Sequence, residues 1–380
     1  MNILNRTEAA IDLTIVEHNF REISRFANGA KMICVIKADA YGHGAIPIGK
    51  LYQKLGADIL AVACLDEALE LRRNGITSPI MILGATSLPF AHFLAENDII
   101  QSVHSLDYAK ALSLAAVELG HTLPVHIKLD TGMSRFGIYA HRESTDTATE
   151  IVKEICSLPS LRIDGLFTHF AEAEIEDTSF TDEQFNSFCK VSENLKKQNI
   201  TFNFCHCANS AAVVNYKKAH LNCVRPGLIL YGYSPTGKSV PGLDIKPAMT
   251  LKSLVADVRE IRAGDSVSYN RRFTATHDMK IAIVCCGYAD GLPRALSGKG
   301  YFLIGGKRAP IIGNVCMDLT IVDVSNIPDV APFDEAVIFG TQNGITLSPD
   351  ELASISGTIS YELLTSVSKR VPRTYTSPLA

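Results

Sequence analysis

The sequence predicts a (β/α)8 barrel of the TIM type followed by a mainly β C-terminal domain. Short apolar runs alternate with amphipathic helical segments from about residue 11 to residue 231. Eight such alternations over about 220 residues are what a parallel barrel requires. After Tyr233, Gly and Pro residues separate short strand-like runs, a pattern typical of a β domain. The 380 residues, 47% hydrophobic and 20% charged, are enough for two well-cored domains.

The expected barrel strands are short runs in which apolar residues predominate. They are residues 32–36, 59–63, 80–83, 99–103, 125–129, 163–168, 202–206 and 223–225. Segments such as 65–71 and 106–120 have the amphipathic pattern of the intervening helices. An open, doubly wound sheet would show the same alternation, so periodicity alone leaves that alternative open.

The last third begins with a linker, because residues 234–242 contain two Pro and two Gly in turn-forming contexts. A helix is expected at 348–356, where Ser348 and Pro349 supply a cap and a first-turn proline. We therefore expect a barrel domain of residues 8–236 and a C-terminal domain of residues 237–380, with residues 1–7 packed against the latter. The expected strands of that domain are 254–261, 281–286, 309–312, 320–324 and 336–339.

Composition argues against several classes of protein. A net charge of −4 gives no electrostatic case for nucleic acid. No apolar run reaches membrane-spanning length, and the N-terminus does not have the pattern of a signal peptide. Ten cysteines in so long a chain do not indicate a disulfide scaffold, and the spacing Cys205-His206-Cys207 is too tight for ordinary zinc pairs. We expect a cytoplasmic protein with reduced thiols, no metal and no membrane partner.

Polar residues follow the predicted strands at their carboxyl ends. Any one of them could be structural, but a barrel gathers such residues at one face, where catalytic groups lie. The residues in question are Lys37, Lys128, Arg135, His169, His206, Asn209, Ser210 and Arg225.

Lys37 stands out because it ends an apolar strand. A lysine there is costly unless it is paired or used covalently, although it could also snorkel to solvent. Desolvation lowers the pKa of a lysine and raises its neutral, nucleophilic fraction, which suits an enzyme that holds an aldehyde cofactor as a Schiff base. Asn209 and Ser210 begin a helix and Gly227 allows close backbone approach, an arrangement that suits a phosphate; ordinary capping explains the first two equally well.

The chain resembles alanine racemase, a pyridoxal-phosphate enzyme of fold type III, over essentially its whole length. The run Val-Ile-Lys-Ala-Asp-Ala-Tyr-Gly-His-Gly at 35–44 is the most specific match. The other matching segments are 128–135, 168–170, 206–212, 224–232, 267–269, 287–291, 315–318, 361–362 and 371–373.

The resemblance implies an isomerase that interconverts L-alanine and D-alanine for peptidoglycan, in a head-to-tail homodimer with shared active sites. Lys37 would carry pyridoxal 5'-phosphate and act as one base, and Tyr269 of the partner subunit would be the other. Arg225, bonded to His169, would face the pyridine nitrogen. The remaining cofactor-binding residues implied are Tyr41, Asn209, Ser210, Gly227, Leu228 and Tyr361.

The resemblance also assigns the substrate side of the site. Lys128 would carry a CO2-derived carbamate that orients Arg135, which would bind the substrate carboxylate together with the backbone of Met317. Tyr288 and Tyr361 would narrow the entrance to the size of alanine.

Some residues depart from the family pattern. Asn270-Arg271-Arg272 replaces the more usual glycine after the tyrosine, and Asp39 and Cys207 stand where Asn and Ala are common. A racemase acting on serine or a broader range of amino acids is therefore the nearest alternative. A non-catalytic cofactor-binding protein would resemble the barrel alone, and a related decarboxylase would be expected to lack Ser268-Tyr269.

Overall fold

The computed structural model describes residues 6–376, which form two compact units. The barrel unit comprises residues 17–40 and 45–245. The β-rich unit comprises the described residues up to Val16, Tyr41–Gly44, and the described residues from Lys246 onward. The predicted domain limits of 8–236 and 237–380 stay a prediction. Within residues 6–376, no helix is both long and apolar enough to span a membrane.

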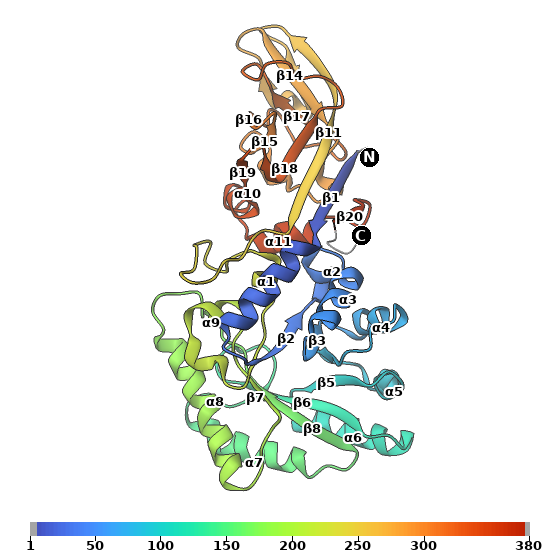
Figure 1. The fold of residues 1–380 in the computed structure, drawn as a ribbon, viewed down its shortest axis with the longest axis vertical. Coiled ribbons are helices and arrows are strands. Elements are labelled where there is room, and N and C mark those ends of the chain that lie inside the picture. Colours follow the sequence, from blue (N-terminus) through green and yellow to red (C-terminus); the bar gives the residue numbers. More distant parts are fainter. Residues whose placement is uncertain (1–5, 377–380) are drawn as a thin grey trace. The chain divides into compact units, whose positions relative to one another are not determined.

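The barrel unit contains the parallel barrel that the sequence predicts, and each of the eight expected strands is confirmed (Figure 1). The sheet order is β10-β2-β3-β4-β5-β6-β8-β9 and every pairing along it is parallel. Arg225 N–H, just after β10, donates to the carbonyl of Ala208, just after β9, at 2.8 Å, so the barrel is nearly closed. The strands are β2 (Lys31–Val35), β3 (Ile59–Val62), β4 (Ile80–Ile82), β5 (Ile99–Val103), β6 (Leu123–Asp130), β8 (Leu161–Phe167), β9 (Phe204–His206) and β10 (Cys223–Val224), with the short β7 (Ile138–Tyr139) on β6.

Helices follow most of these strands and bury their apolar faces. The helix α6 illustrates the local causes: Ser105 accepts a hydrogen bond from Tyr108 N–H at its start, and Gly120, with φ +66°, ends it. The helices are α1 (Leu13–Phe26), α3 (Ala45–Leu55), α4 (Leu65–Arg73), α5 (Ala91–Glu96), α6 (Leu106–Leu119), α7 (Thr145–Cys156), α8 (Ser179–Lys197) and α9 (Ser210–Asn215).

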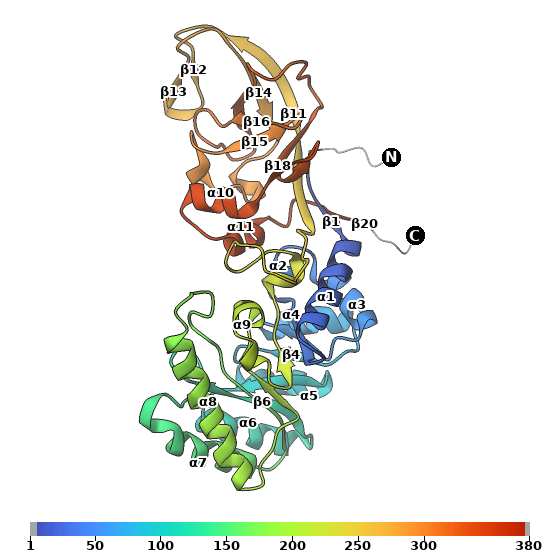
Figure 2. The same ribbon diagram turned by 60° about the vertical axis from the view of Figure 1, so that its left-hand side comes forward.

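The β-rich unit is built on the long strand β11 (Met249–Ile261), which pairs with β1, β14 and β18 (Figure 2). All of its pairings are antiparallel except that of β1 with β20. The five strands and the helix that the sequence predicts here are confirmed. The sequence did not predict β1, β12, β13, β15, β19, β20 and α11. The other elements are β1 (Thr7–Asp12), β12 (Ser266–Val267), β13 (Phe273–Thr274), β14 (Met279–Val284), β15 (Tyr301–Ile304), β16 (Lys307–Pro310), β17 (Thr320–Asp323), β18 (Glu335–Gln342), β19 (Ile345–Leu347), α10 (Pro349–Ser356), α11 (Ser360–Ser366) and β20 (Arg373–Thr376).

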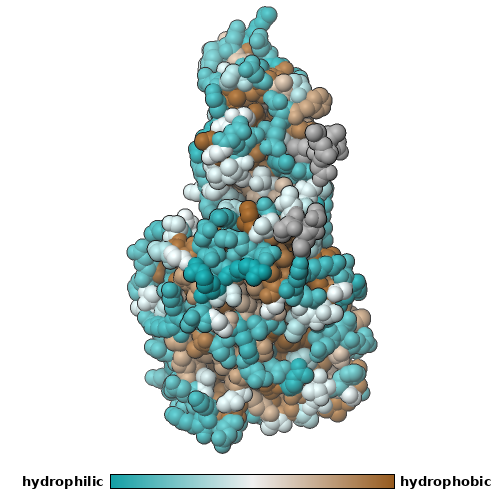
Figure 3. All heavy atoms as spheres, in the orientation of Figure 1, coloured by the Kyte–Doolittle hydropathy of each residue, from teal (hydrophilic) through white to brown (hydrophobic). Residues whose placement is uncertain are grey.

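Apolar side chains fill the interior of both units. The strands β4 and β5 are buried along their whole length, as expected for strands covered by helices on one side and barrel core on the other. Figure 3 shows one face of the protein, on which hydrophilic side chains predominate and apolar ones are scattered among them.

Candidate active site

Lys37 follows the buried strand β2 and begins a turn of the opposite hand to an ordinary helix. This turn is α2 (Lys37–Tyr41), in which Ala38, Asp39, Ala40 and Tyr41 have φ between 52° and 54°. A left-handed turn costs L-residues about 1–2 kcal/mol each, so surrounding bonds must hold it. Ala40 N–H donates to the carbonyl of Ile36 at 2.9 Å, and the carboxylate of Asp39 accepts from Ala45 N–H at 2.7 Å.

Four cationic side chains gather at this end of the barrel: Lys37, Lys128, Arg135 and Arg225. Burial, followed by the charges of Arg135 and Arg225, lowers the pKa of Lys37, and Glu67 opposes that shift. Burial, again followed by Arg135 and Arg225, lowers the pKa of Lys128 to about 8. A lowered pKa raises the neutral, nucleophilic fraction of each amine, and Lys128 is therefore partly uncharged at mildly alkaline pH.

Arg225 lies at the centre of a buried hydrogen-bond network. It is 3% exposed, and its Nη2 donates to the carbonyl of Thr168 and to His169 Nδ1, both at 2.9 Å. Its Nη1 donates to His206 Nδ1 at 2.7 Å. An arginine can only donate, so both histidines accept through Nδ1. Burial and the charge of Arg225 hold the pKa of His169 and of His206 well below the usual range, so both rings are neutral.

The network continues one residue further into the barrel. His206 Nε2, which carries the ring proton, donates to His126 Nδ1 at 3.0 Å. His126 is fully buried, and burial together with Arg225 lowers its pKa to about 3. A Cβ on Gly165 would lie 2.5 Å from the His126 ring, so glycine is needed on the neighbouring strand. The sequence placed His206 among the strand-end residues but predicted neither its bond to Arg225 nor its bond to His126.

A polar cradle lies beside this network at the start of α9. Asn209 caps the helix by accepting from Ala212 N–H at 3.0 Å. The hydroxyl of Ser210 accepts from Gly227 N–H at 2.9 Å, and this bond leaves its own hydrogen for an acceptor such as a phosphate oxygen. Leu228, fully buried, begins the 3-10 turn that follows Gly227.

The β-rich unit holds the remaining predicted residues. The rings of Tyr41 and Tyr361 lie 6.0 Å apart at their centroids. Tyr269, Tyr288 and Met317 are strongly exposed, at 70%, 43% and 52%. A shallow hollow of about 410 Å³ contains both Tyr269 and Met317, together with Ser268, Cys316, Asp318 and Leu319.

Hydrogen bonds to Asn314 hold the turn that contains Tyr269. The side-chain Nδ2 of Asn314 donates to the carbonyl of Tyr269 at 2.8 Å, and Ser268 Oγ donates to the carbonyl of Asn314 at 2.9 Å. Asn314 is 3% exposed. Ser268, Asn270 and Arg271 all have positive φ, so this turn is also strained and needs such anchors. No motif in the sequence singled out Asn314.

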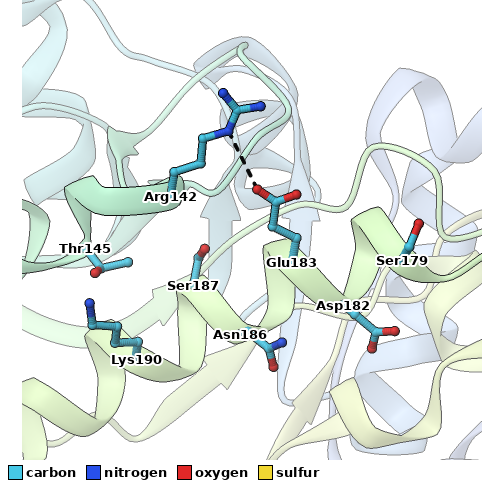
Figure 4. A pocket seen from close by; sticks show the side chains of 8 residues that line it. All are labelled: Arg142, Thr145, Ser179, Asp182, Glu183, Asn186, Ser187 and Lys190. Carbon is cyan, nitrogen blue, oxygen red and sulfur yellow. Dashed lines mark ion pairs between the residues drawn. The ribbon is translucent and has the colours of Figure 1, made fainter.

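Another hollow of the barrel unit, of about 410 Å³, lies against α8 and mixes charges of both signs (Figure 4). Arg142 Nε lies 3.8 Å from Glu183 Oε1 there, and Lys190 also lines the wall. None of its lining residues is among the predicted strand-end residues, so it is separate from the cluster around Lys37.

Comparison with known proteins gives two family matches that together span most of the chain. The model described as "Alanine racemase, N-terminal domain" matches residues 11–235, and "Alanine racemase, C-terminal domain" matches residues 248–375. A curated alanine racemase of Clostridium perfringens is 43% identical over 97% of this chain and 94% of its own length. One from Desulfosudis oleivorans is 40% identical over 97% of this chain and 96% of its own.

Solved structures of alanine racemases also match this chain. The alanine racemase of Clostridium difficile 630 matches with a TM-score of 0.92 at 35% identity, covering 98% of this chain and 96% of that one. The Bacillus anthracis enzyme with bound L-Ala-P matches with a TM-score of 0.89 at 35% identity, covering 98% and 95%.

Proposed function

This chain belongs to the alanine racemase family and is a racemase; from that premise we propose that it interconverts L- and D-alanine with pyridoxal 5'-phosphate and two bases. The observation that carries the proposal is Lys37. It is half-buried just after β2, and its pKa is lowered by burial and by Arg135. In the same barrel unit, Arg225 follows β10 and Ser210 begins α9.

The donor set fits this cofactor. A lysine with a lowered pKa suits the aldehyde, the hydroxyl of Ser210 with the backbone at Gly227 and Leu228 suits the phosphate, and Asn209 fixes the turn that presents them. Tyr41 and Tyr361 would add phenol donors to the phosphate. The cofactor, when bound, withdraws electrons from the amino acid and so acidifies its α-hydrogen.

Arg225 would face the cofactor's ring nitrogen. Its guanidinium stays protonated at all working pH values and offers only donors, so it keeps that nitrogen without a proton. Neutral His169 and His206 fix the Nη atoms at 2.9 and 2.7 Å and cannot take the proton from them. By keeping that nitrogen unprotonated, Arg225 would limit side reactions such as transamination.

Two bases on opposite faces account for racemisation. Inversion at carbon requires that a proton leaves one face and another arrives on the other, because a single base returns the proton to the side it left. We assign Lys37 Nζ to one face and Tyr269 Oη of the partner subunit to the other. The 70% exposure of Tyr269 supports a role outside its own core, in a head-to-tail homodimer.

Arg135 would bind the substrate carboxylate, and Lys128 would support it as a carbamate. Carbamate formation needs a neutral amine, and a Lys128 pKa of about 8 supports it. The resulting anion would neutralise part of the charge shared by Lys37, Lys128 and Arg135, and would orient Arg135. The backbone of Met317 from the partner subunit would assist, and Tyr288 and Tyr361 would restrict the entrance.

The test is a circular-dichroism assay of the holoprotein against L-alanine, L-serine and larger L-amino acids. We expect fast loss of optical activity with alanine and much slower loss with the others, as D-alanine supply for peptidoglycan would need. Faster turnover of serine than of alanine would favour the alternative, a racemase acting on serine or a broader range of amino acids. No turnover of any amino acid tested would refute the proposal.

A further inference from the structure

The left-handed turn that carries Lys37 needs an anchor at its first peptide group. The four residues after Lys37 are not glycines, yet all have φ near +53°. The anchors named so far, Asp39 to Ala45 and Ala40 to Ile36, hold its later part. They leave the Ala38 N–H, directly next to Lys37, to another acceptor.

That acceptor is Glu67, in the first turn of α4. Its Oε1 accepts from Ala38 N–H at 2.7 Å, and its Oε2 accepts from Ala63 N–H at 2.7 Å. Ala63 directly follows β3, so one carboxylate ties the ends of β2 and β3 together. A carboxylate accepts at both oxygens, and charge-assisted bonds of this kind are stronger than neutral ones.

Glu67 also acts on the charge of Lys37. Of the charged groups that shift the pKa of Lys37, Arg135 and Arg225 lower it and Glu67 raises it. Removal of its charge would therefore alter both the geometry and the protonation of the lysine.

We propose that Glu67 is a positioning residue for Lys37, whose carboxylate clamps the left-handed turn to the end of β3 and so fixes where the lysine side chain begins. This inference rests on the proposed role of Lys37. It does not make Glu67 a catalytic residue, because the carboxylate binds backbone N–H groups.

The variants that test it are Glu67→Gln and Glu67→Ala, with Glu70→Gln as the matched control on the exposed face of the same helix. Glutamine keeps one acceptor oxygen and turns the other into a donor, so one of the two bonds is lost. We expect kcat to fall about tenfold to a hundredfold with KM nearly unchanged, because a misplaced reacting group slows the step more than it weakens binding. Glu67→Ala should lose more, and Glu70→Gln nothing.

A second measurement does not depend on turnover. Ala38 is exposed, so its amide hydrogen should exchange rapidly with solvent unless the Glu67 bond protects it. We expect protection in the native holoprotein and at least about tenfold faster exchange in Glu67→Gln. Rapid exchange at Ala38 in the native protein, or a Glu67→Gln variant with native kcat, would overturn the inference.

The two measurements separate this inference from the proposed function. A protected Ala38 in a protein that does not racemise alanine would contradict the function and leave the clamp intact. An unprotected Ala38 in an active racemase would contradict the clamp alone.

Discussion

The barrel unit and the β-rich unit differ in how much of their proposed machinery is completed within one chain. Arg225 and Lys128 are 3% and 6% exposed, and histidines and carbonyl groups hold the Arg225 guanidinium. In the β-rich unit, Tyr269 and Met317 are 70% and 52% exposed. A large side chain left in water forfeits about 1.5–3 kcal/mol of burial energy. The barrel therefore holds these side chains internally, whereas the β-rich unit leaves Tyr269 and Met317 exposed, as their proposed role in a partner subunit's site would require.

Both units nevertheless hold a strained turn with a side-chain anchor. In the barrel unit, Glu67 and Asp39 bind backbone N–H groups at or after the left-handed turn. In the β-rich unit, Asn314 donates to a backbone carbonyl of the Tyr269 turn. The first anchors are carboxylates among cations and the second is a neutral amide, so we expect the barrel anchors to contribute more.

The largest effect should come from Lys37→Ala, which removes the proposed covalent attachment point of the cofactor. We expect the visible absorbance of the holoprotein and its racemase activity to be lost. Borohydride trapping in the native protein, followed by peptide mass mapping, should place the label on Lys37. The exposed Lys50, on α3, offers the matched control Lys50→Ala, which should keep both signals. A label on any other lysine contradicts the assignment.

The next largest effect concerns the β-rich unit. Tyr269→Phe removes a hydroxyl and keeps the ring, so packing should barely change. Racemisation should fall about 10²- to 10⁴-fold in both directions, as expected for loss of a general acid–base group. Exchange of the α-hydrogen with solvent deuterium should persist for D-alanine and collapse for L-alanine. Tyr139→Phe, at another exposed tyrosine, is the control.

A mixing experiment then tests whether the two units act across subunits. A heterodimer of Tyr269→Phe and Lys37→Ala chains rebuilds one intact site from two damaged chains. Some activity should therefore return on mixing. Equal deuterium exchange with both enantiomers, or no recovery in verified heterodimers, would defeat the two-base reading.

Much of the fold was predictable because apolar runs specify buried strands. All eight barrel strands were found this way, whereas β1 and β20 were missed since Thr-Glu-Ala-Ala-Ile-Asp and Arg-Thr-Tyr-Thr carry few large apolar residues. The left-handed turn at α2 was not predictable, because Lys-Ala-Asp-Ala-Tyr is compatible with an ordinary helix and only distant bonds decide its hand.

The candidate site could also be predicted only in part. Lys37 and Arg225 could be predicted from their positions after strands, because a barrel brings the carboxyl ends of its strands to one face. No knowledge of side-chain contacts is needed for this step. Glu67 was missed because it lies on an amphipathic helix, where a glutamate is ordinarily solvated. Asn314 was missed because a single asparagine in a β-rich segment has no distinguishing pattern. The roles of all these residues stay predictions.

A smaller effect is expected at Lys128, whose proposed role is to orient Arg135 on the substrate side of the site. Lys128→Ala should lower kcat/KM about tenfold to a hundredfold, the equivalent of one charged hydrogen bond of about 1.5–3 kcal/mol. A small carboxylate such as acetate should restore part of it. Lys110→Ala, at an exposed lysine paired with Glu154, should leave the rate unchanged.

The pH dependence of Lys128 follows from its lowered pKa. With a value of about 8, the neutral amine rises from a minor species at pH 7 to the major one at pH 9. At fixed dissolved ¹³CO2, the carbamate signal in NMR should increase over that range and level off above it. A signal that rises only near pH 10.5, the ordinary value for lysine, would show that burial does not act as described.

The smallest effect should come from Asn314→Ala in the β-rich unit. The Tyr269 carbonyl loses its donor at 2.8 Å, but this turn is close to solvent and water can replace part of the bond. We expect about 1 kcal/mol of lost stability in urea unfolding and a decrease of a few-fold in kcat, with KM little changed. The exposed Asn326 of the same unit gives the control Asn326→Ala. If Asn314→Ala instead slows turnover as much as Glu67→Gln does, the anchor of the outward-facing turn is as important as the barrel clamp. The proposed difference between the two anchors would then be wrong.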